Sequence, residues 1–216
     1  MRPRVVAAVS PRSTLGPAVP LVAATRNPGK VAELRRLLAG YPWSIVGLDE
    51  AGVTGELEEP GPGYVDNALA KAAVVSAATG LCALADDSGI EVPALRGWPG
   101  PRSARWREGS DEDRLRGLIE TVEKETPDDR RVRYVCVVAL VSPDGEPVTA
   151  RGQCDGVLVA PRGTGGFGYD PGFLSDDLGI TFGEAGAEEK DRVSHRARAV
   201  AALGRSGWLD WSAGTV

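Results

Sequence analysis

The sequence is poor in the residues that build disulfide frameworks and zinc sites. Its 216 residues include three cysteines and one histidine. The cysteines, Cys82, Cys136 and Cys154, are far apart, and no Cys-x-x-Cys pair occurs. An odd and scattered set of this kind argues against a disulfide scaffold and favours reduced thiols. We therefore expect a cytoplasmic protein.

Long apolar runs are also missing. A helix that crosses a bilayer needs about 20 apolar residues, and no stretch of the sequence approaches that length. We expect no membrane partner. Residues 1–20 contain arginines and prolines but no acid, and the apolar run 5–9 is too short for the core of a signal peptide. We expect a disordered extension over residues 1–20, one domain over residues 21–204 and a tail over residues 205–216.

A positive net charge is absent too, since the formal net charge is −5. This value argues against broad binding to duplex nucleic acid, which needs a basic face, but not against a small anionic substrate. The 25 basic residues include only four lysines, Lys30, Lys71, Lys124 and Lys190. A chain that otherwise uses arginine keeps lysine where a compact point charge is needed. We therefore regard the lysines as candidate site residues.

Apolar periodicity predicts a mixed α/β sheet with flanking helices. The expected strands cover residues 21–24, 44–48, 81–85, 133–141 and 148–159, with short candidates at 173–174 and 180–182. The expected helices follow Gly29, span residues 64–79, begin after a capping box at Ser110, and run from about 187 to 203.

Asp86-Asp87-Ser88-Gly89 directly follows one of the apolar strands. Ligands gather at the carboxyl ends of strands in α/β sheets. Two carboxylates at such a point can hold Mg²⁺ and orient a water molecule. The alternative is an acidic turn without chemistry, because Asp, Ser and Gly also make ordinary turns.

Two further segments carry groups suited to phosphates and metal ions. Thr25-Arg26-Asn27-Pro28-Gly29-Lys30 joins a strand to a helix, whose free N–H groups favour an anion. It is not a Walker A loop, because Val31 stands where Ser or Thr is needed. Glu56, Glu58 and Glu59 form either a solvated acidic loop or a second source of metal-binding carboxylate.

The last two segments have the chemistry to recognise a base. Gly165-Gly166-Phe167-Gly168-Tyr169-Asp170-Pro171 combines close backbone approach with two aromatic rings. Lys190, Ser194, His195 and Arg196 form a polar cluster on the expected last helix. Each segment also has an ordinary structural interpretation, as a hairpin loop or a helix surface.

Taken together and in this order, the motifs resemble the inosine/xanthosine triphosphate pyrophosphatase family, also called Ham1-like proteins. The resemblance runs from about residue 21 to 203. It includes the segments above, Asp66-Asn67-Ala68 with Lys71, and Pro99-Gly100 with Ser103-Ala104-Arg105. Two positions depart from the family pattern: Arg26 replaces a common Gly or Ser, and Arg114 replaces an expected Asn.

The resemblance implies a homodimer whose elongated mixed sheet carries two lobes around a central cleft. It implies Mg²⁺-dependent hydrolysis of ITP, dITP and XTP to the monophosphate and pyrophosphate. Asp87 matches the general base and a metal ligand, with Asp86, Glu58 and Glu59 as further candidate metal ligands. The substrate-binding matches are Thr25, Arg26, Asn27, Pro28, Gly29, Lys30, Lys71, Ser88, Phe167, Gly168, Tyr169, Asp170, Lys190, His195 and Arg196.

Two other functions fit parts of the pattern. A Maf-like pyrophosphatase would act on other nucleotides, but the Ser194-His195-Arg196 cluster argues against it. A nucleotide-binding module without catalysis would not need Asp87 and its acidic neighbours.

Overall fold

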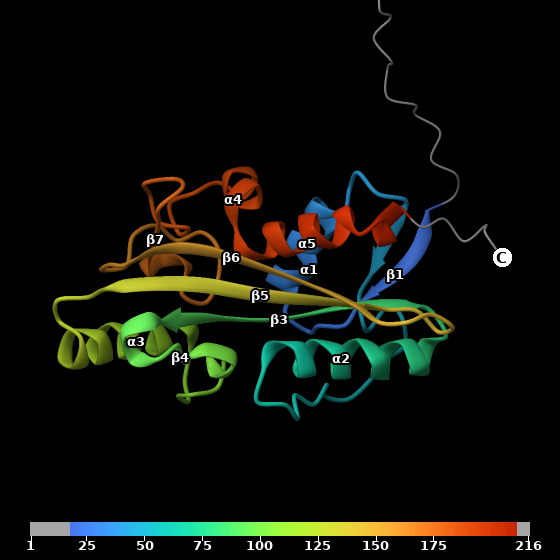
Figure 1. The fold of residues 1–216 in the computed structure, drawn as a ribbon, viewed down its shortest axis with the longest axis horizontal. Coiled ribbons are helices and arrows are strands. Elements are labelled where there is room, and N and C mark those ends of the chain that lie inside the picture. The colour runs from blue at the N-terminus through green and yellow to red at the C-terminus, as the bar shows by residue number, and fades with distance from the viewer. Residues whose placement is uncertain (1–17, 211–216) are drawn as a thin grey trace, which may run out of the picture.

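The computed structural model describes residues 18–210, which form a seven-stranded sheet with helices on both faces (Figure 1). The strands are β1 (Val19–Ala23), β2 (Trp43–Val46), β3 (Cys82–Val92), β4 (Trp98–Pro99), β5 (Arg131–Val141), β6 (Val148–Leu158) and β7 (Phe173–Ser175). The helices are α1 (Pro28–Leu37), α2 (Tyr64–Thr79), α3 (Asp111–Glu125), α4 (Ala187–Val193) and α5 (His195–Arg205).

The sheet is mixed and follows the order β2-β1-β3-β5-β6-β7, with β4 paired to β3. β1 runs parallel to β2 and β3, whereas β3, β5, β6 and β7 pair in antiparallel fashion. Three strands of 11 residues, β3, β5 and β6, make the molecule elongated. The prediction of an elongated mixed α/β sheet is confirmed.

Alternation along β3 separates two apolar cores on the two faces of the sheet. Leu84 packs with α1 and α5, and Ala83 and Ala85 pack with α2. A third core at the other end of the sheet joins α3 to β7 and to Phe182. β3 and β5 contribute to the cores at both ends, which agrees with the expected two lobes.

The ends of two helices match their sequence signals. Gly80 closes α2 in the left-handed conformation, with φ 67°, which glycine adopts without a steric penalty. Ser110 and Asp113 form the predicted capping box of α3, where Ser110 Oγ accepts from Asp113 N at 3.1 Å.

The expected end of β3 at Ala85 is wrong. The strand continues through Asp86 and Asp87 to Val92, because β5 pairs with it residue by residue as far as Glu91. Asp, Ser and Gly are poor strand formers, but a long antiparallel partner overrides that local preference. The acidic motif therefore lies inside a strand, not in a turn.

The expected single helix over residues 187–203 is also wrong. Ser194 has ψ 155°, which ends α4, and its hydroxyl accepts from Ala197 N at 3.2 Å to cap α5. A serine hydroxyl can bond to the backbone in this way and end a helix. Apolar residues spaced at the helical period can therefore continue across the junction of two helices.

The domain division stays a prediction, because residues 1–17 and 211–216 lie outside the described residues. Two boundaries shift nonetheless: β1 starts at Val19, inside the expected extension, and Leu209 is buried in the core, inside the expected tail. Among residues 18–210, no helix is long and apolar enough to cross a membrane.

Candidate active site

The candidate site is built around an open edge of β3. β1 pairs with β3 only as far as Leu84, and β4 pairs with it only from Glu91. Between them, side chains replace a neighbouring strand: Lys71 Nζ donates to Asp86 O at 2.9 Å, and Ile90 N donates to Ser103 Oγ at 2.9 Å. Ser88 N donates to Asp87 Oδ1 at 3.1 Å.

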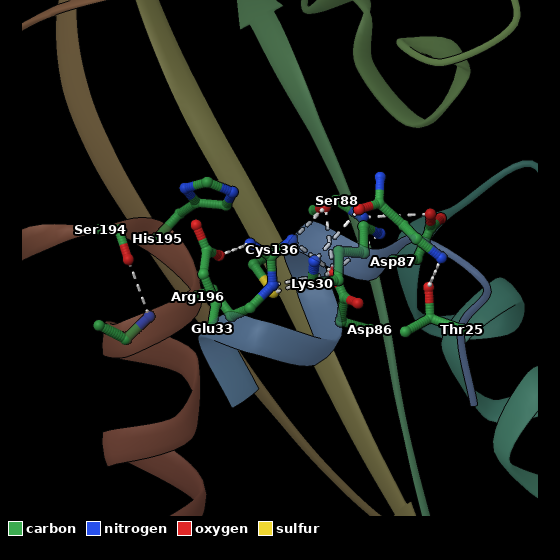
Figure 2. Close-up of polar contacts among 12 residues, drawn as sticks. Thr25, Lys30, Glu33, Asp86, Asp87, Ser88, Cys136, Ser194, His195 and Arg196 are labelled. Atoms are coloured by element: carbon green, nitrogen blue, oxygen red, sulfur yellow. Dashed lines mark hydrogen bonds and ion pairs between the residues drawn. The ribbon is translucent and has the colours of Figure 1, made fainter. Parts of the chain in front are cut away.

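Asp86 lies on the face of the sheet that α1 and α5 cover, and cations surround its carboxylate (Figure 2). Asp86 Oδ2 accepts from Arg196 Nη2 at 2.8 Å and pairs with Lys30 Nζ at 3.0 Å. Burial alone would raise the pKa of Asp86, but Arg196, Lys30 and Lys71 hold it well below its ordinary value. Asp86 is therefore a buried anion that fixes two cations.

Glu33 continues this chain of alternating charges from α1. Its Oε1 pairs with Lys190 Nζ at 2.7 Å, and its Oε2 pairs with Arg196. Lys190 Nζ also reaches Asp170 Oδ2, at 2.6 Å. Burial would raise the pKa of Glu33, but Arg196 and Lys190 lower it below its ordinary value. Removing one member of such a buried network leaves an uncompensated charge.

A pocket opens beside this network on the same face of the sheet. His195, Tyr134 and Tyr169 line its inner part, and Asn27, Lys30, Ser88, Phe167, Gly168, Asp170, Lys190 and Arg196 also contact it. The rings of His195 and Tyr134 stack with centroids 4.4 Å apart. Burial lowers the pKa of His195 well below 6.5, with help from Arg196 and Lys190. The imidazole is therefore neutral at neutral pH.

The aromatic loop 165–171 closes the pocket and is fixed by hydrogen bonds. Phe167 N donates to Asp170 Oδ2 at 2.8 Å, and Tyr169 Oη donates to Ser103 O at 2.6 Å. Phe167 also meets the start of α1: a Cβ on Gly29 would lie 2.6 Å from Phe167 Cδ1. Glycine at position 29 thus lets the aromatic loop approach the helix N-terminus.

Asp87 lies on the opposite face of the sheet, beside α2. Asp87 Oδ2 accepts from Asn67 Nδ2 at 3.0 Å, and Lys71 Nζ lies 3.8 Å from Asp87 Oδ1. Burial raises the pKa of Asp87, and Lys71 and the Asn67 hydrogen bond oppose that effect. A buried carboxylate with a raised pKa, beside a lysine, has the properties of a general base.

Glu59 joins Asp87 through Lys71, whereas Glu58 does not share this contact. Lys71 Nζ donates to Glu59 Oε1 at 2.6 Å, and Arg105 pairs with the other oxygen of Glu59. Glu58 is exposed and lies beside Glu56 at a hollow that Lys71 also lines, but no ion pair joins it to Lys71. Among residues 18–210, no cluster of three or more His, Cys, Asp or Glu side chains is arranged to hold a metal ion.

Residues 25–30, the turn that joins β1 to α1, line two different hollows. Asn27 caps α1, its Oδ1 accepting from Lys30 N at 3.1 Å, and Asn27 and Lys30 both line the pocket. Thr25, Arg26 and Pro28 instead line a different hollow, next to residues 47–50. Residues of the same turn therefore do not all face the same hollow.

Sequence reasoning missed Glu33 and gave Asn67 no individual role. Glu33 had a signal: it lies three residues after Lys30, next to the apolar Leu34, so the helical period places a charge toward the core. Asn67 is fully buried, with Gly61 N donating to its Oδ1 at 2.9 Å, but an isolated Asn in a helix gives no sign of that.

Comparison with known proteins gives one family over nearly the whole described chain. The sequence model of the Ham1 family matches residues 21–206. A dITP/XTP pyrophosphatase from Symbiobacterium thermophilum is 53% identical over 182 residues, covering 84% of this chain and 91% of that protein. A dITP/XTP pyrophosphatase from Thermus thermophilus is 47% identical, covering 85% and 89%.

Solved structures agree with the sequence relatives. A HAM1 protein from Coxiella burnetii superposes with a TM-score of 0.78 at 34% identity, covering 88% of this chain and 98% of that one. A nucleoside-triphosphatase (dITP/XTP pyrophosphatase) from Mycobacterium abscessus gives a TM-score of 0.67 at 41% identity, covering 85% and 98%.

Proposed function

The chain belongs to the Ham1 family, and on that basis we propose that it hydrolyses non-canonical purine nucleoside triphosphates to the monophosphate and pyrophosphate. ITP, dITP and XTP are the proposed substrates. The family match leaves the alternative of a Maf-like enzyme without support.

One arrangement carries the proposal beyond family membership. Lys30 and Ser88 line the pocket on one face of β3, and Asp87 and Lys71 lie on the other side of the open β3 edge. A nucleoside held in the pocket has its phosphates at this edge, between two lysines and a buried carboxylate. Lysines and helix N–H groups neutralise phosphate oxygens, and a carboxylate beside them can activate water.

The acidic groups at this edge fit a magnesium ion. Mg²⁺ is bound in proteins by one or two carboxylates together with substrate phosphate oxygens and water, so a cluster of three protein ligands is not required. Asp87 and Glu59 both contact Lys71, and both present hard oxygen donors. We assign the ion to these two residues, where it would supply charge neutralisation for the phosphates.

This assignment changes two of the candidate metal ligands. Asp86 lies on the other face of the sheet from Asp87 and pairs with Lys30 and Arg196, so we give it a positioning role for those cations. Glu58 is exposed, whereas Glu59 is partly buried and contacts Lys71, so Glu59 is the better candidate.

Asp87 is the proposed general base for water that attacks the α-phosphorus. The proton moves from water to Asp87, the bond to the bridging oxygen breaks, and pyrophosphate leaves. Asn67 donates to Oδ2 of Asp87 and so orients the carboxylate. Lys30 and Lys71 bind the phosphates and stabilise the charge on the leaving group.

Base selection is assigned to Lys190, His195 and Arg196 in the pocket. A purine with a 6-keto oxygen accepts a hydrogen bond from such donors, whereas the 6-amino group of adenine brings a donor against a donor. Guanine has the same 6-keto oxygen, so its exclusion depends on the 2-position. Polar sites of this kind discriminate by about 10⁴-fold. The proposal extends to a homodimer in the cytoplasm, as the family resemblance implies.

The test is the product and the substrate order. Purified protein should release pyrophosphate from ITP, dITP and XTP far faster than from GTP or ATP, and only with Mg²⁺ present. Release of orthophosphate, or equal rates on ATP, would overturn the proposal. Tight nucleotide binding without turnover would favour the non-catalytic module.

A further inference from the structure

Arg26 makes a set of contacts that nucleotide binding does not require. Its Nε donates to Gly55 O at 2.8 Å, its Nη1 to Asp49 Oδ1 at 2.9 Å, and its Nη2 to Val53 O at 3.0 Å. All three acceptors belong to one loop, 23 to 29 residues further along the chain. The guanidinium fork therefore joins the end of β1 to the loop that follows β2.

The side chain of Arg26 points away from the nucleoside pocket. Its neighbours Asn27 and Lys30 line that pocket, while Arg26 lines the separate hollow beside residues 47–50. The expectation that Arg26 binds substrate rested on its place in the turn, and it stays a prediction.

The loop is anchored at its start and left without a regular element after Gly55. Leu48 and Val53 are buried in the core beneath α2, and Val53 N donates to Leu48 O at 2.9 Å. Gly55 has φ 85°, a conformation that redirects the chain. Residues 56–59, here called the acidic segment, follow at once and carry Glu59.

The acidic segment is held between two polar anchors. Arg26 binds the carbonyl of Gly55 immediately before it, and Asn67 accepts from Gly61 N shortly after it, at 2.9 Å. Asn67 also donates to Asp87, so the second anchor connects the segment to the proposed base. The first anchor connects it to the turn that carries Lys30.

We propose that Arg26 is a positioning residue: it fixes the acidic segment, and with it Glu59, relative to the turn of residues 25–30. This inference rests on the proposed function, because Glu59 is assigned there to the magnesium ion. The surface ion pair with Asp49 alone would contribute little, since Asp49 is 91% exposed. The two hydrogen bonds to the carbonyls of Val53 and Gly55 fix where the loop lies; we call this set of Arg26 contacts the tether.

Arginine suits this task. Its planar group donates in several fixed directions, so one side chain reaches three acceptors together. A lysine is a point donor that satisfies one or two of them without the fixed fork. A side chain as short as that of Ser reaches none of the three.

The experiment compares Arg26→Ala and Arg26→Lys with Arg35→Ala in the full-length chain. Arg35 is the matched control, because it contacts Ile45 O and Glu50, upstream of the acidic segment. Two readouts are needed: backbone hydrogen exchange of residues 50–60 without ligand, and the Mg²⁺ concentration that gives half-maximal ITP hydrolysis.

For Arg26→Ala we expect faster hydrogen exchange in residues 50–60. The Mg²⁺ concentration for half-maximal hydrolysis should rise about tenfold, because that is the effect of losing one or two net hydrogen bonds. The preference for ITP over GTP should stay unchanged, because the pocket is untouched. Arg26→Lys should fall between Arg26→Ala and the wild type. Arg35→Ala should match the wild type in its Mg²⁺ requirement and in the exchange of residues 52–60, which lie beyond its contact with Glu50.

Unchanged hydrogen exchange of residues 50–60 in Arg26→Ala would overturn the proposal that Arg26 holds the acidic segment. So would a higher KM for ITP at saturating Mg²⁺ with an unchanged Mg²⁺ requirement, since that pattern places Arg26 on the nucleotide. If the wild type fails to hydrolyse ITP but Arg26→Ala still loosens residues 50–60, the proposed function fails while the tether itself stands.

Discussion

Asp86 and Asp87 are neighbours in β3, yet their carboxylates lie on opposite faces of the sheet, one beside Arg196 and the other beside Asn67. Alternation along the strand separates them, and the separation gives them opposite pKa shifts. Asp86 is a permanent anion that organises cations, while Asp87 has the raised pKa of a group that exchanges protons.

Replacing Asp87 by Asn should lower kcat for ITP by about 10²-fold or more, because the amide cannot accept a proton from water. The fold should persist, since the amide oxygen can still accept hydrogen bonds. Steady-state kinetics and circular dichroism measure the two effects. Asp144→Asn, at an exposed hairpin turn, is the control and should behave as the wild type. A nearly active Asp87→Asn protein would place the base elsewhere.

Replacing Glu33 by Gln should weaken both stability and base selection. Lys190 and Arg196 lose a shared counter-charge in a buried network, and breaking such a pair costs about 3 kcal/mol. Urea unfolding gives the stability, and the ITP to ATP ratio of kcat/KM gives the selection. Glu50→Gln changes an exposed pair with Arg35 and is the control. An unchanged ratio would show that Lys190 and Arg196 keep their positions without Glu33.

His195 should not titrate near its ordinary pKa, because burial and its cationic neighbours lower that pKa. It is the single histidine in the sequence, so one ring resonance in the proton NMR spectrum reports it directly. We expect no change in its chemical shift between about pH 6 and 8, around the ordinary value of 6.5. A midpoint near 6.5 would contradict the buried, neutral ring.

The same shift has a consequence for stability. Below about pH 6.5 the unfolded chain binds a proton on His195 that the folded chain does not bind, so folding loses up to about 1.4 kcal/mol per pH unit as the pH falls. Above that pH the folded and unfolded forms are both neutral and the effect vanishes. Urea unfolding of wild type and His195→Gln between pH 5 and 8 should show a shallower acid loss in the variant.

Replacing Gly29 by Ala should displace Phe167 and raise the KM for ITP by about tenfold, because overpacking of this kind costs about 1–3 kcal/mol. Gly40→Ala is the matched control, since a Cβ there meets no atom within 4 Å. Kinetics on ITP for both variants give the comparison. Equal KM values would show that the aromatic loop yields without cost.

The sequence predicts the elements whose local signals agree with their tertiary surroundings. The helix closed by Gly80 and the capping box at Ser110 are of this kind. Prediction from the sequence fails where tertiary contacts decide where a strand or helix ends. Asp86 continues a strand because β5 pairs with it, and Ser194 breaks a helix by turning its hydroxyl to the next turn.

The candidate site follows the same rule. Motifs single out Lys30, Asp86 and Asp87, but only the pleat of β3 places Asp86 beside Lys30 and Asp87 on the opposite face. Glu33 and Asn67 act through contacts with residues 163 and 20 positions away, and no local pattern reports such contacts.

The open edge of β3 has a further consequence, for solubility. An unpaired strand edge is a template on which another chain can add, and proteins protect such edges from aggregation. Here Lys71, Asp87 and Ser103 occupy the backbone groups of Asp86, Ser88 and Ile90. The contacts that assemble the site therefore also shield the strand. Substitutions that remove these side chains should cost soluble yield along with turnover, so inactive variants deserve a check for self-association.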